Sequence, residues 1–131
     1  MRLAIVEAHP TKSPATLNDE WFVVENRGDT SFSTSGCTLA TGRGGNRLRA
    51  RGQLDPGFTV APGERVRVIT GNPGKKAHGA VPDDGVRNYH LFLAEPLFTG
   101  PGTVLALTLR QLEVARATVD PAAAGGVAAE K

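Results

Sequence analysis

Glycine and proline interrupt this chain at short intervals, and their spacing limits what it can fold into. The 131 residues include 16 glycines and nine prolines, which lie between short apolar runs rather than in one linker. This spacing favours many turns and short strands over long helices. With 40% apolar residues, the chain is long enough to bury one core and too short for two domains of ordinary size.

Several segments between the turns have the short apolar or alternating pattern of strands. We predict strands within residues 3–6, 20–26, 32–39, 47–51, 58–60, 65–69, 89–94, 104–109 and 114–119. The last two are expected to form a hairpin joined near Arg110 and Gln111. Seven to nine strands at a spacing of roughly 8–12 residues are typical of a β-sandwich or a barrel, so the chain is expected to be all-β.

The only tryptophan, Trp21, lies in the run 20–26, which has apolar residues on both strand faces. This pattern predicts a strand that is covered on both sides for part of its length. We interpret Trp21 as a packing residue on a central strand. A ligand-stacking role is the alternative.

Residue types that carry chemistry are sparse. Cys37 is the only cysteine, so no intramolecular disulfide can form. The three histidines, His9, His78 and His90, lack the spacing of a zinc site, and 83–85 lacks the pattern of a calcium loop. Cys37 as a nucleophile with His9 or His90 as its base is the enzymatic alternative, which nothing in the spacing supports. We therefore predict no catalytic residue, no metal and no cofactor.

The arginines are the one group of charged residues whose pattern indicates a functional surface. Residues 47–51 alternate strictly, which places Arg47, Arg49 and Arg51 on one strand face. If segment 65–69 lies beside this strand, six arginines crowd one surface: Arg43, Arg47, Arg49, Arg51, Arg65 and Arg67. One interpretation is an exposed face that guards a strand edge against aggregation. The other is a surface for an anionic partner, although aromatic residues interleaved with the arginines, typical of single-strand binding, are missing.

The formal net charge of +2 is too small to indicate nucleic acid by itself. The apolar stretch in MRLAIVEAHP is too short for a secretory signal, and no apolar run is long enough to span a bilayer. We therefore expect a soluble, cytoplasmic protein without a membrane span, unless the chain is one domain of a longer protein.

Three segments, taken in order, resemble the lamin-tail domain. They are EWFVVEN at 20–26 followed by Gly28, SGCTL at 35–39, and FTVAPGE at 58–64 followed by Val66, Val68, Thr70 and Gly71. In bacterial members of that family the matching segments look like EWVEIxN.G, LSGWTL and F.LAPG. The resemblance covers about Leu3 to Val119. Two positions depart from it: Cys37 stands where the family usually has tryptophan, and the final hairpin lacks the usual acidic-glycine turn.

The resemblance implies an immunoglobulin-like β-sandwich over residues 1–119. Lamin-tail domains are interaction modules without catalytic residues, which implies a non-catalytic interaction or structural role for a stand-alone bacterial member. The partner would be an unknown protein or a second copy, bound through a strand edge or the loop 71–85. Nucleic acid or another polyanion on the arginine face is the alternative. The small residues of 120–131 are expected to form a flexible tail.

Overall fold

A computed structural model describes residues 3–11, 13, 15–43, 47–72, 74, 79, 81–98 and 100–128. Within them the chain is all-β, as the turn spacing predicts, with only single turns of 3-10 helix. The strands are β1 (Leu3–His9), β2 (Trp21–Asn26), β3 (Phe32–Ser33), β4 (Thr38–Arg43), β5 (Arg49–Gln53), β6 (Thr59–Val60), β7 (Arg65–Ile69), β8 (Arg87–His90), β9 (Thr103–Leu109) and β10 (Leu112–Thr118). The 3-10 turns are η1 (Leu17–Asp19) and η3 (Ala124–Gly126). No helix in these ranges is long and apolar enough to cross a membrane.

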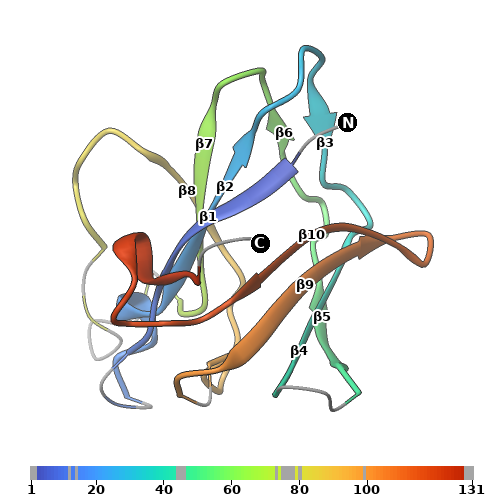
Figure 1. The fold of residues 1–131 in the computed structure, drawn as a ribbon. Coiled ribbons are helices and arrows are strands. Elements are labelled where there is room, and N and C mark those ends of the chain that lie inside the picture. The colour runs from blue at the N-terminus through green and yellow to red at the C-terminus, as the bar shows by residue number, and fades with distance from the viewer. Residues whose placement is uncertain are drawn as a thin grey trace.

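The strands form two four-stranded sheets and one small sheet (Figure 1). The first sheet has the order β1-β2-β7-β8, the second sheet has the order β10-β9-β4-β5, and β3 pairs with β6. Neighbouring strands run antiparallel except for β7 and β8, which are parallel. A parallel pair requires a crossover, and residues 70–86 make that connection.

One hydrophobic core lies between the two large sheets. Alternate residues of each strand point into it, since side chains along a strand alternate between faces. The first sheet contributes Phe22, Val24, Val66 and Val68, and the second contributes Leu39, Leu105 and Leu107. Each such fully buried side chain stabilises the fold by about 1.5–3 kcal/mol. Cys37 is also buried in this core, and its burial raises the pKa of the thiol.

The central strand β2 is covered on both faces, as its sequence pattern predicts. Val23 lies on the face opposite the main core, yet it is fully buried, as is Ile69 on the neighbouring strand β7. Leu17 of η1 is buried as well. The side chain of Asn18 donates to the carbonyls of Asn72 and Gly79, which ties η1 to the crossover segment.

Several strand boundaries differ from the predicted ones. The first strand continues to His9, and the segment 32–39 divides between β3 and β4. The strand predicted at 89–94 ends at His90, because Phe92 has a left-handed backbone with φ 56° that breaks the alternation.

Residues 120–128 are folded, which differs from the flexible tail expected for this segment. Val119 and Val127 form an antiparallel bridge, and the amide of Ala128 donates to the carbonyl of Thr118 at 2.9 Å. Glycine makes this packing possible, because a Cβ on Gly126 would lie 2.0 Å from the carbonyl oxygen of Ala8. The segment therefore covers part of the edge of β1.

The β9–β10 hairpin turns at Arg110 and Gln111, as predicted. Both residues have left-handed backbones, with φ 52° and 70°. Two-residue turns of this kind favour Asn-Gly, and larger side chains strain them.

Replacing this pair with Arg110→Asn and Gln111→Gly should therefore raise the free energy of unfolding by about 1 kcal/mol. Urea denaturation measures the difference. The matched control is Arg110→Ala with Gln111→Ala, which removes the same long side chains and retains the strain. Equal stability of the two double variants would contradict this explanation.

Candidate interaction surface

The six arginines do not share one surface. β5 pairs with β4 at the edge of the second sheet, whereas β7 lies inside the first sheet. Arg65 and Arg67 are therefore separated from the other four. The expectation that 65–69 neighbours 47–51 fails because β7 is paired on both sides, with β2 and with β8, and has no free edge for β5.

Arg65 lies in a surface network of opposite charges. Its Nε contacts Glu25 at 2.7 Å and its Nη1 lies 3.7 Å from Glu7, while Arg27 contacts the other oxygen of Glu25 at 2.8 Å. Hydrogen bonds from Arg27 and Arg65 lower the pKa of Glu25. Arg65 is thus neutralised by its neighbours and offers little to an anionic partner.

Arg67 is a packing residue beneath the crossover segment, only 3% exposed. Its guanidinium lies 4.8 Å from the centre of the Trp21 ring, on which the His9 ring is also stacked at 4.9 Å. It also forms an ion pair with Asp84 and a 3.0 Å hydrogen bond to Asn88 Oδ1. Its hydrogen bond to Asp84 lowers the pKa of that carboxyl. Trp21 therefore packs within the fold, and Asp84 fastens the crossover to the sheet.

The other four arginines lie along the β4–β5 hairpin. Two of them hold backbone carbonyls: Arg43 donates to Pro101 at 3.0 Å, and Arg51 donates to Pro96 at 3.0 Å. Arg47 and Arg49 are exposed, and across the described ranges neither has a carboxylate within ion-pair distance. These two residues are exposed positive charges on this edge.

Glu20 is a buried anchor that the sequence patterns did not reveal. It is fully buried, and its carboxylate accepts hydrogen bonds from Thr70 Oγ1 at 2.7 Å, the Leu97 amide at 2.6 Å and the Phe98 amide at 3.3 Å. Burial raises the pKa of Glu20, against the lowering effect of these hydrogen bonds. A single glutamate at the start of an apolar run was the only available signal.

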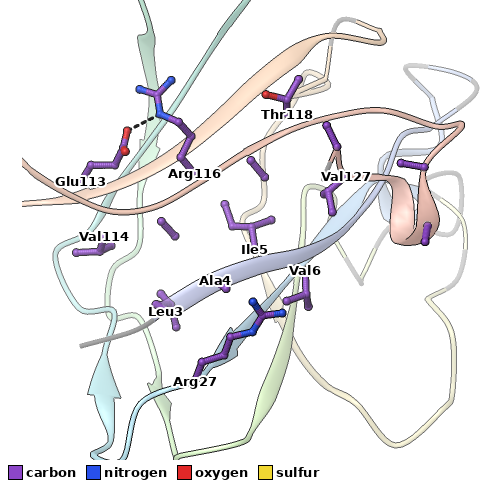
Figure 2. A pocket seen from close by; sticks show the side chains of 15 residues that line it. Leu3, Ala4, Ile5, Val6, Arg27, Glu113, Val114, Arg116, Thr118 and Val127 are labelled. Atoms are coloured by element: carbon purple, nitrogen blue, oxygen red, sulfur yellow. Dashed lines mark hydrogen bonds and ion pairs between the residues drawn. The ribbon is translucent and has the colours of Figure 1, made fainter. Parts of the chain in front are cut away.

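An open groove of about 820 Å³ runs between β1 and β10, which form neighbouring edges of the two sheets (Figure 2). Alkyl side chains line much of it, including Leu3, Ile5, Val114 and Val127. Its charged lining residues are Arg27, Glu113 and Arg116. We call this feature the β1–β10 groove.

A smaller hollow of about 330 Å³ lies beside Phe92. The Phe92 ring is 63% exposed and lies 6.2 Å from the His90 ring. Its backbone is held on both sides, because the amides of Leu91 and Leu93 donate to the carbonyls of Ile69 and Thr70. Sequence alternation had predicted a strand here and gave no sign of this exposed aromatic ring.

The remaining candidates for chemistry are dispersed. His9 Nδ1 lies 2.6 Å from the carbonyl of Asp19, and His90 Nδ1 lies 3.2 Å from that of Gly71. His78 and parts of the 71–85 loop lie outside the described residues. In the part of the chain that the structure describes, no three His, Cys, Asp or Glu side chains are grouped so as to hold a metal ion.

No protein-family model matches the chain, and no curated protein matches it either. The two sheet edges must therefore be interpreted from their own contacts. One is the cationic edge of β5, and the other is the uncovered edge of β10 beside its groove.

The raised pKa of Glu20 gives an expected pH dependence. Between its ordinary pKa of 4.5 and the raised value, the unfolded chain ionises Glu20 while the folded chain retains the proton, so rising pH favours unfolding. The free energy of unfolding of the wild type minus that of a Glu20→Gln variant should fall as pH rises through this window. The fall should be about 1.4 kcal/mol for each pH unit between the two values.

Urea denaturation of both proteins from about pH 4 to about pH 8 tests this. Glu25 and Asp84 have lowered pKa values and lose their stabilising effect as pH falls, but both proteins contain them, so their contributions cancel. A difference that grows with rising pH would contradict the raised pKa.

Proposed function

We propose that this chain is a non-catalytic, immunoglobulin-like interaction module that binds a partner polypeptide along β10. The observation that carries the proposal is the β1–β10 groove beside a strand edge that is largely unpaired (Figure 2). An exposed edge presents backbone amides and carbonyls that an extended segment can pair with, while a neighbouring hollow accepts alternate side chains. Both features are present here on one side of the fold.

This edge already accepts one short extended segment. The amide of Ala128 donates to the carbonyl of Thr118, and this contact lies at the end of β10. Residues Leu112 to Ala117 continue the same edge, and Glu113 to Ala117 line the groove. A partner strand would therefore extend a pairing that the fold itself begins.

The resemblance to the lamin-tail domain supports the same class of function, because those domains act as interaction modules. The two large sheets around one core agree in outline with an immunoglobulin-like sandwich. The core position of Cys37, where that family usually has tryptophan, is filled by a smaller side chain in this chain.

A lysine that points into the groove should weaken partner binding. We expect a library of displayed peptides to yield extended, apolar-alternating binders, and Ala117→Lys should weaken them at least about tenfold, since a cation would lie on the apolar lining. Ala50→Lys, on the exposed opposite edge strand β5, is the control for the added charge, and circular dichroism must show that both variants are folded, because Ala117 packs partly against the core. Titration with a labelled selected peptide measures both. Equal binding by the two variants would contradict the proposal.

The arginine edge supports a second candidate function, the binding of nucleic acid or another polyanion. The specific observation is that Arg47, just before the edge strand β5, and Arg49, its first residue, are exposed without a carboxylate in reach among the residues described. Anchored next to them, Arg43 and Arg51 add positive charge. Arginine pairs well with phosphate, and such binding weakens steeply with salt.

Replacing Arg47 and Arg49 with serine tests this candidate. If each contacts one phosphate of duplex DNA, the slope of log affinity against log salt should become shallower by about 1.8. The control, Arg27→Ser with Arg110→Ser, changes net charge equally at positions outside this edge. Arg51 stays intact because it anchors the backbone at Pro96. Identical slopes for the two double variants would remove this candidate.

A further inference from the structure

We infer that a second copy of this chain occupies the β10 edge, with the two β10 strands paired antiparallel about a two-fold axis at their β-bulges. This inference rests on the proposed function and names its partner. It follows from three features: the other edge strands of the two large sheets are covered, short or like-charged, the bulge in β10 has a specific geometry, and the charges on β10 are placed symmetrically about this bulge.

Three of the four edge strands of the two large sheets are poor sites for a second copy. The backbone of Gly125 and Gly126 covers part of β1. β8 has only four residues and is followed by the left-handed Phe92, so its edge is too short to pair well. β5 carries Arg49 and Arg51, so pairing two such strands would bring like charges together. The remaining edge strand is β10.

The bulge in β10 aligns Glu113 with Arg116. Glu113 lies opposite Thr108 of β9, and Arg116 lies opposite Ala106, so three residue steps on β10 span two on β9. Without the bulge, residues three apart would point to opposite faces. With it, Glu113 and Arg116 share the outer face, where their side chains form a 2.7 Å ion pair within one chain.

The same bulge directs the backbone groups of both residues away from β9. The amide of Val119 donates to the carbonyl of Thr103 on β9, and the carbonyl of Thr118 points outward, where Ala128 donates to it. Alternation along an antiparallel strand gives Arg116 the outward orientation of Thr118. Because the bulge absorbs one residue, Glu113 has this orientation too. Both can therefore pair with a second strand.

A two-fold axis at the bulge makes this edge self-complementary. Glu113 of each copy then lies opposite Arg116 of the other, which gives two pairs of opposite charge on the outer faces. The open stretch Leu112–Ala117 is centred on the same axis, so the whole stretch takes part. Leu112, 72% exposed in one copy, would lie against Ala117 of the other.

The inner face of the added strand also fits. Val114 and Ala115 of the second copy point to the side of the β1–β10 groove, where Leu3 and Ile5 offer alkyl surface. Figure 2 shows Ile5 and Val127 between β1 and β10, and the Glu113–Arg116 pair on β10. A second copy therefore matches the edge in backbone pairing, in charge and in apolar contact.

Charge reversal tests this arrangement. Wild-type protein should sediment as a concentration-dependent dimer. Glu113→Arg and Arg116→Glu, each alone, should raise the dimer dissociation constant at least about tenfold, because each places two like-charged pairs across the axis. An equimolar mixture of the two variants should dimerise again, since every introduced charge then lies opposite its complement.

The double variant Glu113→Arg with Arg116→Glu is the control, since it keeps the ion pair within each chain and the pairs between chains. It should dimerise like the wild type, and circular dichroism should confirm that all variants are folded. A monomeric wild type, or single variants that dimerise normally, would overturn the inference. If the protein is monomeric but selected peptides still bind wild type and not Ala117→Lys, the proposed function stands and only the second copy is excluded.

Discussion

The core shared by two four-stranded sheets is the constraint on which the rest of this structure depends. It requires the chain to pass from the first sheet to the second after β8, and the buried carboxylate of Glu20 fixes that passage by binding the amides of Leu97 and Phe98. All three groups that contact this carboxylate are donors, so a glutamine amide would set an N–H against another N–H. The site thus suits a carboxyl group with two oxygens, even though burial disfavours its charged form.

The arginines near the strands have two different roles, which depend on the neighbours of each one. Arg65 and Arg67 lie on β7, where Arg65 pairs with Glu25 of β2 and Arg67 pairs with Asp84 of the crossover, so both charges are neutralised within the fold. Arg47 and Arg49 are exposed to solvent at the start of β5. A count of arginines cannot separate these roles, because what distinguishes them is the presence of Glu25 and Asp84 on neighbouring segments.

Local patterns predicted the local structure well. The burial of β2 on both faces was predicted from apolar residues at both odd and even positions of this strand. The final hairpin was predicted from the strand-like runs on either side of Arg110 and Gln111. Pairings between distant segments could not be predicted this way. The sequences of 47–51 and 65–69 both alternate, and this pattern does not indicate that β5 and β7 belong to different sheets. The contact of Glu20 with Phe98 spans 78 residues, and the groove exists only because β1 and β10 meet from opposite ends of the chain.

The two edges of the second sheet have opposite effects on association with a second copy. On β5, Arg49 and Arg51 repel an identical strand, and such a charged edge keeps sheets from joining at random. On β10, one glutamate and one arginine are placed symmetrically about a bulge, so the pattern is attractive when two copies meet antiparallel. A bulge usually interrupts an edge, but here it restores the alignment of Glu113 with Arg116. An open, self-complementary edge on one side and a like-charged edge on the other would limit association to a closed pair, because neither copy offers a second compatible edge for growth.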